Sequence, residues 1–454
     1  LNLAPKHPMT QPKFEDLYRS MDFERPLDWA NPKDRLLYVP GLHTSEGISP
    51  IDELCANIEM SDRPGTWLFT GHRGVGKSTE LRRMAAQLRD AGHVVIVADM
   101  GEYLNLSEAI STEGLLLTLV AALADGANEQ LTVDRLPRQQ NYAERFWTYL
   151  KTTEINLTQV SLDLPADPAK FSLKAELKQN PDFRQKVLAA VNGSPARLAQ
   201  QVRDFVKVVA EDARTVRSNP GTRVVLILDS LERLRVTGAD AQVCYDAITR
   251  TFDVQGECLK LEHIDVVYSV PPYLPFLVPR IGSYFGVEVC TLPHVKVFET
   301  PAPGRLPAAQ PVQPCAHGID LLVQCLRQRY PAVEQLIPLP LLERLALASS
   351  GSVRDYLRLI KSACTKAKVA NATIPLQGER WAEMAEQVLR NEMPLATDDK
   401  KWLQEVRLTH GSSLDSIANL HQLARLFDSG VILNYRNGRD WCEVHALLHD
   451  ELSV

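Results

Sequence analysis

The residues most clearly able to do chemistry lie in the segment 71–78, GHRGVGKS, which has the spacing G-x-x-x-x-G-K-S. Glycines allow a backbone to curl so that successive N–H groups surround a phosphate. A lysine in this position adds a positive charge on the β- and γ-phosphates, and a serine hydroxyl is a ligand of Mg²⁺. The pattern is a Walker A motif and predicts nucleotide binding, with ATP and Mg²⁺ as the expected ligands.

The elements on either side of the segment support this prediction. An apolar run at 66–70 precedes it, and apolar residues at helical spacing follow it up to Gly92. A loop between a strand and a helix places the positive end of the helix dipole at the phosphates. The residues expected to contact the nucleotide are Gly71, Gly74, Val75, Gly76, Lys77, Ser78 and Thr79.

A second apolar run, 224–228, ends in Asp229. The carboxyl ends of parallel strands meet at the ligand crevice, so Asp229 is predicted to hold Mg²⁺ together with Ser78. Glu232, three residues further on, is a candidate to polarise the attacking water. The alternative for Glu232 is a surface acid in the first turn of the next helix. Asp99 ends another apolar run and is interpreted as a helix or turn cap, with a place near the nucleotide site as the alternative.

These segments resemble a known family. The loop continued as GKSTEL, with LILDSLERL at 226–234, is similar to the AAA+ and STAND branch of the P-loop ATPases over roughly residues 51–368. The resemblance implies a parallel-sheet core under a helical lid. Typical AAA+ enzymes have a water-activating glutamate directly after the metal-binding aspartate, where this sequence has Ser230. The resemblance therefore supports nucleotide binding more directly than hydrolysis.

The same resemblance implies roles for residues on other elements. Ser269, in the predicted strand 264–270, falls at the sensor 1 position near the γ-phosphate, although a buried serine often bonds only to backbone. Arg354 lies in a Gly-x-x-Arg segment that resembles sensor 2 of the lid, and its alternative is a surface arginine. Arg280, and after it Arg250, are candidates for an arginine finger acting on a neighbouring subunit.

The predicted fold class is α/β, with a strand at 287–292 completing a five-stranded parallel core. Apolar residues alternate with polar ones within 155–177, which predicts a hairpin in a long insertion. Five prolines between 301 and 314 predict an extended connector. The predicted divisions are an N-terminal extension (1–50), a P-loop ATPase core (51–298, with the insertion at about 127–220), a proline-rich linker (299–318), a helical lid (319–390) and a winged-helix-like domain (391–454).

Charge bears on the last of these domains. The chain has 50 Lys and Arg against 56 Asp and Glu, a net charge of -6, and residues 391–454 hold six basic and ten acidic residues. This balance disfavours contact with DNA phosphates. Helices followed by a hairpin, with Asn437-Gly438 as its turn, therefore favour a winged helix that contacts protein or autoinhibits the enzyme. His445 and His449 lack a metal-binding motif and are interpreted as structural.

Cysteine and hydropathy patterns indicate the compartment. The eight cysteines form no CxxC pair, which argues against a zinc cluster or a disulfide framework and fits a reducing cytoplasm. The longest apolar stretch, 114–124, is too short to span a bilayer, so no membrane association is expected.

Together these patterns predict an ATP-binding, ATP-hydrolysing regulatory switch that controls its own assembly as a homo-oligomer or acts on a partner effector protein. Resemblance alone implies a role in bacterial anti-phage defence. The alternative is a DNA-associated ATPase of the replication-initiator or transposition-regulator type. A third hypothesis, a nucleotide-binding scaffold with little turnover, rests on Ser230.

Overall fold

The computed structural model describes residues 12–105, 108–131, 141–152, 174, 178, 180, 185–189, 195–233, 241–302, 304, 311–411, 420–436 and 439–452. A five-stranded parallel sheet lies at the centre of the core, in the order β2-β3-β4-β1-β5. Its strands are β1 (Thr66–Thr70), β2 (Val94–Asp99), β3 (Val224–Asp229), β4 (Asp265–Val270) and β5 (Cys290–Thr291). The predicted α/β fold is confirmed, with a last strand shorter than the predicted 287–292.

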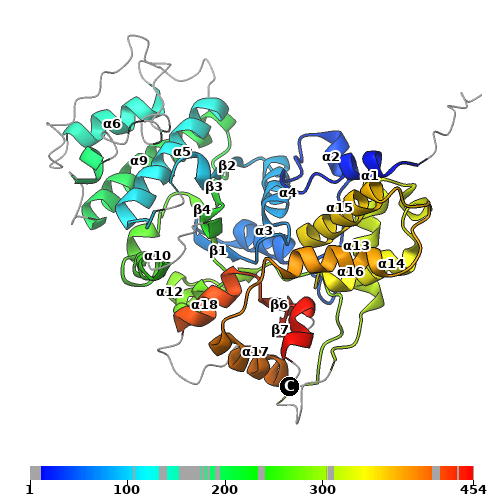
Figure 1. The fold of residues 1–454 in the computed structure, drawn as a ribbon. Coiled ribbons are helices and arrows are strands. Elements are labelled where there is room, and N and C mark those ends of the chain that lie inside the picture. Colours follow the sequence, from blue (N-terminus) through cyan, green and yellow to red (C-terminus); the bar gives the residue numbers. More distant parts are fainter. Residues whose placement is uncertain are drawn as a thin grey trace, which may run out of the picture.

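Helices cover both faces of this sheet, which explains why its inner strands are apolar at nearly every position. On one face lie α3 (Pro50–Met60) and α4 (Lys77–Asp90), and on the other lie α5 (Thr112–Gln130) and α9 (Pro195–Arg217), with α6 (Tyr142–Thr152) packed outside α5 (Figure 1). Gly126 lets α5 approach β2 closely, because a Cβ there would lie 2.4 Å from the Ile96 side chain.

The predicted insertion thus supplies α9, which covers the sheet face opposite α3 and α4, and α6, which packs on α5. The hairpin predicted within 155–177 lies almost entirely outside the described residues.

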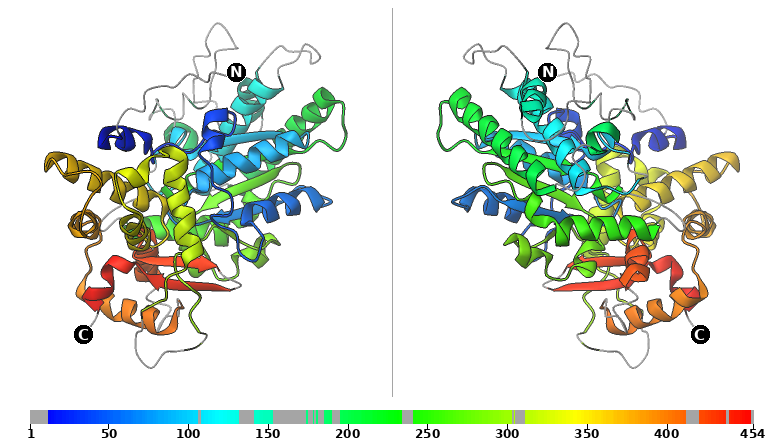
Figure 2. Two further views of the ribbon diagram at one scale, coloured as in Figure 1. Left: turned by 90° about the vertical axis from the view of Figure 1, so that its right-hand side faces the viewer. Right: turned by 90° about the vertical axis from the view of Figure 1, so that its left-hand side faces the viewer.

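The segment predicted to be a lid forms four helices, α13 (Ala316–Arg329), α14 (Leu339–Ala348), α15 (Val353–Val369) and α16 (Arg380–Arg390), and we keep the name lid for them. After it come α17 (Thr397–Thr409), α18 (Leu420–Asp428), the antiparallel strands β6 (Ile432–Arg436) and β7 (Asp440–Val444), and α19 (His449–Leu452). The lid and the C-terminal segment share one apolar core. The β6–β7 hairpin and α17 lie at the opposite end of the molecule from α6 (Figure 2). The winged-helix assignment stays a prediction, and its turn residues Asn437 and Gly438 lie outside the described residues.

The N-terminal segment contains α1 (Phe14–Ser20), which packs its apolar face on the lid core, and α2 (Pro32–Leu36). The remaining elements are short. They are the helices α10 (Ala241–Thr249), α11 (Leu274–Leu277) and α12 (Ile281–Phe285), the π-helical turn Arg250–Val254, and the 3-10 turns Met100–Glu102, Leu231–Arg233, Gly256–Leu259, Val333–Gln335 and Ala446–Leu448. Within the described ranges, no helix is both long and apolar enough to cross a bilayer.

Candidate nucleotide-binding site

The loop between β1 and α4 has the backbone conformation that its glycines permit. Gly74 and Gly76 have φ values of 86° and 106°, a region that favours glycine, and α4 begins directly afterwards at Lys77. A Cβ on Gly74 would lie 2.9 Å from both the Arg354 Cβ and the Ser352 Oγ. This glycine is therefore needed for the turn and also for the close approach of the lid.

Lys77 is buried at the centre of the site. Its Nζ donates to the carbonyl oxygens of Gly71 (2.7 Å) and His72 (2.8 Å), and it lies 3.2 Å from Oε1 of Glu232. Burial lowers the pKa of Lys77, and the charges of Glu232 and Asp229 oppose that effect. The ammonium group is thus held against the loop by contacts that a phosphate oxygen can replace.

Asp229, at the end of β3, is buried beside Lys77 and Ser78. Burial and the Glu232 charge raise its pKa, and a hydrogen bond from the Ser78 hydroxyl opposes them. The buried Oδ1 atom has no hydrogen-bond donor among the described residues. An orphaned carboxylate oxygen next to a serine hydroxyl fits Mg²⁺, which takes oxygen ligands and is usually held by one or two carboxylates together with substrate phosphates.

Glu232 reaches the same site because the chain turns sharply after β3. Ser230 has a φ of 77°, unusual for a residue with a side chain, and the 3-10 turn Leu231–Arg233 follows. Glu232 is only 4% exposed, so the surface-acid interpretation is wrong. Its Oε2 accepts a hydrogen bond from Ser269 Oγ at 2.9 Å. Burial raises the Glu232 pKa, but Lys77 and Ser269 outweigh it and the net pKa is lowered.

Two arginines complete this side of the site. Arg73, which sequence reasoning did not single out, donates from Nη2 to the Glu232 carbonyl at 3.3 Å. Arg354, at the start of α15, donates its backbone N–H to the Gly74 carbonyl at 3.1 Å. Burial lowers the Arg354 pKa, and the nearby Asp355 raises it. Arg250 and Arg280 are exposed and lie away from the crevice, so their role as arginine fingers stays a prediction.

The crevice beside the loop has a volume of about 160 Å³. It is lined by Gly74–Thr79, Glu232 and Arg354, whereas Gly71, Asp229 and Ser269 lie outside its lining. Asp99 is the cap that was predicted, since its Oδ1 accepts from the Gly101 N–H at 2.9 Å.

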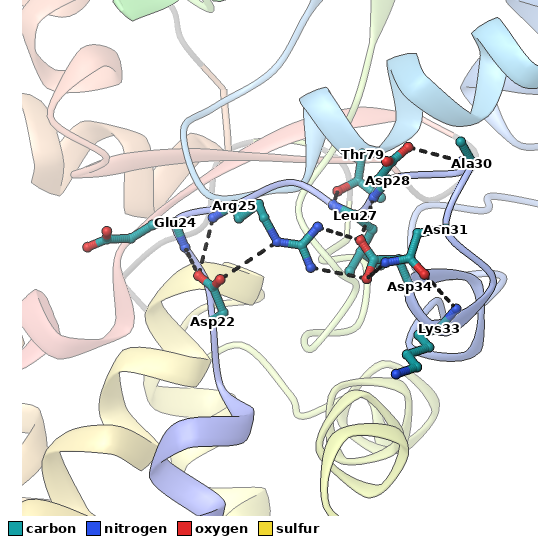
Figure 3. Close-up of polar contacts among 10 residues, drawn as sticks. All are labelled: Asp22, Glu24, Arg25, Leu27, Asp28, Ala30, Asn31, Lys33, Asp34 and Thr79. Carbon is teal, nitrogen blue, oxygen red and sulfur yellow. Dashed lines mark hydrogen bonds and ion pairs between the residues drawn. The ribbon is translucent and has the colours of Figure 1, made fainter.

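The opposite wall of the crevice comes from the N-terminal segment. Residues 22–27 together with Leu37, Tyr38, Leu42 and His43 line it, and we call residues 22–43 the strap. The Leu27 N–H donates to Thr79 Oγ1 at 3.1 Å, which ties the strap to α4 (Figure 3). The sequence analysis treated this region only as an extension, because the strap carries no motif of its own.

An ion pair holds the strap in shape. Arg25 donates to both carboxylate oxygens of Asp34, from Nη1 at 2.5 Å and from Nη2 at 3.1 Å (Figure 3). The Asp28 N–H donates to Asp34 Oδ2 at 2.8 Å, so the carboxylate joins three points of the strap. The hydrogen bonds from Arg25 lower the pKa of Asp34 despite its burial.

We expect Asp34→Asn to weaken nucleotide binding by loosening this wall, on the order of tenfold, because a bidentate charged pair is lost. The effect should have a pH dependence in the wild-type chain. The pKa of Asp34 is lower in the folded chain than in the unfolded chain. The ionised carboxylate therefore stabilises the fold at pH values above its pKa in the unfolded chain, and this stabilisation is lost as the pH falls through its pKa in the folded chain. Calorimetric titration of ATP tests this, with Asp62→Asn at an exposed position as the control, and equal affinities of the Asp34→Asn chain and the wild type would contradict it.

Ser230 offers a second prediction, on the turn that aims Glu232. Ser230→Gly should fold normally, since glycine adopts a φ of 77° without strain, whereas Ser230→Val should lower the free energy of unfolding by roughly 1–3 kcal/mol. Denaturant titration measures both. A valine variant as stable as the glycine variant would show that this backbone conformation is not required.

Comparison with known proteins adds to this geometry. No curated protein sequence matches the chain significantly. Solved structures that match at low similarity include the Aeropyrum pernix ORC2 protein (13% identity, TM-score 0.37, 96% of this chain and 95% of that one) and a Walker-type ATPase of Pyrococcus abyssi (14%, 0.39, 92% and 99%). A third is the Thermotoga maritima RuvB Holliday junction branch migration motor (13%, 0.36, 95% and 98%). At these values, the similarities carry no information on function.

A family match covers the part of the chain that holds most of the site. Residues 50–245 match the family described as "AAA ATPase domain". That span includes the phosphate loop, Asp229 and Glu232, and ends before Ser269 and Arg354. The AAA part of the predicted resemblance is confirmed for this span, and the STAND part stays a prediction. By its sequence, this region is similar to the AAA ATPase domain.

Proposed function

We propose that this chain is an ATP-binding and ATP-hydrolysing switch, in which nucleotide sets the position of the lid on the core. The observation that carries the proposal is the direct contact of Arg354 with the loop, through its backbone N–H on the Gly74 carbonyl. Its guanidinium makes no hydrogen bond or ion pair with any other described residue and lines the crevice. A γ-phosphate in the crevice would therefore give this lid cation an anionic partner.

Phosphate binding, Mg²⁺ binding and proton abstraction are assigned to separate side chains of the site. Lys77 and the loop amides bind the phosphates, while Ser78 and Asp229 hold Mg²⁺. Mg²⁺ neutralises charge on the phosphate oxygens when it is bound. Glu232 is the proposed general base, because it is the buried carboxylate that lies next to Lys77 and is held by Ser269. When the phosphates compete for Lys77, the Glu232 Oε1 atom becomes available to accept a proton from water.

Ser230 does not exclude hydrolysis in this account. The left-handed turn at Ser230 and the 3-10 turn after it bring the carboxylate of Glu232 to the loop lysine from three residues beyond the metal-binding aspartate. This arrangement supports turnover over the scaffold hypothesis. Phosphate release by the purified chain tests the choice, and no release above background would favour a scaffold.

The switch is proposed to act on assembly, as a homo-oligomer, or on a partner effector protein. Lid and C-terminal segment share one core, so a lid movement would carry the C-terminal helices with it. The experiment is to measure the mass and the small-angle scattering of the chain with ATP, with ADP and with neither. Different masses or radii of gyration in ATP and ADP are expected, and identical values in all three conditions would contradict a switch.

The biological role and the partner of the switch are further proposals. A role in bacterial anti-phage defence follows only from resemblance. The DNA-associated alternative is tested by a gel shift over a range of salt concentrations, because phosphate contacts weaken steeply with salt. The excess of acidic over basic residues in 391–454 supports a protein partner for the C-terminal segment.

A further inference from the structure

A second cavity, of about 520 Å³, lies between the loop, the lid and the C-terminal helices. Its volume is within the range of small-molecule sites in proteins. His72 and Arg73 come to it from the loop, Arg354 from α15, and His445 from the segment after β7. The nucleotide crevice lies on the other side of the same loop. Both cavities are lined in part by Arg73, Arg233 and Arg354.

His445 presents a buried N–H group to this cavity. Its Nδ1 accepts a hydrogen bond from the Leu447 N–H, so the ring proton is on Nε2. Burial lowers the pKa of His445 to about 3, so the ring is neutral. The side chain is 2% exposed, and Nε2 has no acceptor among the residues that the structure describes. A buried donor without an acceptor costs about 1–3 kcal/mol, which a ligand oxygen would remove.

His72 repeats this pattern from the loop side. It is 3% exposed, its ring stacks on Phe427 with centroids 5.5 Å apart, and neither ring nitrogen has a hydrogen-bond partner within the described part of the chain. The Phe427 carbonyl is a neighbour of the ring but not in hydrogen-bond geometry with it. Burial holds the pKa of His72 well below its usual value, so one ring nitrogen carries a proton and needs an acceptor.

The four arginines and four acids of the cavity lining balance in formal charge, so the preference for an anionic ligand depends on which of these charges are already paired. Two of its acids, Asp355 and Glu392, are already paired with Arg358, at 3.3 Å and 2.5 Å. The guanidinium of Arg354 is unpaired within the described chain, and Arg233 is paired only with Asp99, at 3.3 Å. The remaining acids of the lining, Glu24 and Asp428, lie on the strap and at the end of α18.

We propose that this cavity binds a small molecule bearing a phosphate or carboxylate group, held by ring N–H groups of His72 and His445. The site is distinct from the nucleotide crevice, and it does not depend on hydrolysis there. Because Arg73, Arg233 and Arg354 face both cavities, occupancy of one site is expected to change the affinity of the other, and the coupling must be reciprocal.

The test is a calorimetric titration of the full chain, first saturated with Mg²⁺ and a non-hydrolysable ATP analogue so that the crevice is filled. Inorganic phosphate and succinate are the two probes, and the tighter one identifies the anionic group. Saturable binding of one equivalent is expected. His445→Asn keeps an acceptor for the Leu447 N–H but removes the ring donor, and it should weaken binding about tenfold.

His449→Asn is the matched control, because His449 lies four residues after His445, contacts the Val444 carbonyl and does not line the cavity. The affinity of the His449→Asn chain for the probe should equal that of the wild type. His72→Phe keeps a ring stacked on Phe427 and should weaken binding by a similar factor. This variant replaces His445→Asn as the test of the cavity if His445→Asn does not fold. Absence of saturable binding, or equal affinity in the cavity variants and the wild type, would overturn the proposal and leave solvent as the occupant.

Failure of this proposal can be told from failure of the proposed function. A chain that does not take up the ATP analogue would contradict nucleotide binding. The probes would then be titrated into the chain without nucleotide, and the comparison of His445→Asn with His449→Asn would still decide whether the second cavity is a binding site.

Discussion

Lys77→Ala should weaken ATP binding by about 100-fold or more, because the loop loses its buried ammonium group at the phosphates and truncating a buried charge costs several kcal/mol. The ammonium is fixed by the carbonyls of Gly71 and His72 before any ligand contact is made, so little of its binding energy is spent on ordering it. Isothermal titration calorimetry with Mg²⁺ and a non-hydrolysable ATP analogue measures the change.

This variant also removes the counter-ion of a buried acid, so its stability needs a separate control. Lys77→Ala leaves Glu232 buried without its cation and should lower the free energy of unfolding. The double variant Lys77→Ala with Glu232→Gln removes both charges and should recover stability without recovering affinity. Lys207→Ala, at an exposed position of α9, should leave both properties unchanged. Unchanged ATP affinity in a folded Lys77→Ala chain would refute the site.

Glu232→Gln should abolish most ATP turnover while leaving ATP bound. Loss of a general base typically slows a reaction by a factor of roughly 100 or more, and the amide keeps the shape of the side chain and its contact with Ser269. Phosphate release under saturating ATP measures the rate, and calorimetry measures the affinity. Because the amide no longer holds Lys77 as an ion pair, the affinity for ATP should stay equal or rise.

Glu59→Gln provides the matched control for this prediction, because it makes the same chemical change at an exposed position of α3. A Glu232→Gln chain with wild-type phosphate release would show that another group, or water alone, accepts the proton. In that outcome Glu232 would be a structural partner of Lys77 and nothing more.

The phosphate loop and the sheet were predictable because their signals are local. Walker A spacing specifies the loop, and the apolar runs before Thr70, Asp99 and Asp229 specify parallel strands that are buried on both faces. The family match over 50–245 agrees with both. The position of Glu232 was left open, since a sequence does not show that Ser230 adopts a left-handed conformation that redirects the chain.

The strap could not be predicted as part of the crevice. Its contacts join residues far apart in the sequence, such as Leu27 with Thr79, and they depend on the ion pair between Arg25 and Asp34. The short β5 strand was overestimated for a related reason. A run of β-branched residues predicts extended backbone, but only Cys290 and Thr291 find partners, on Phe69 and Thr70 at the edge of the sheet.

We propose that one nucleotide is enclosed by the loop, the strap and the lid together. Hydrogen exchange of the backbone amides, compared with and without Mg²⁺ and the ATP analogue, tests this enclosure. We expect slower exchange at Gly71–Thr79, in the strap and at the start of α15 around Arg354, all with the same dependence on nucleotide concentration. Protection that leaves the strap and α15 unchanged, or that spares the loop, would contradict it.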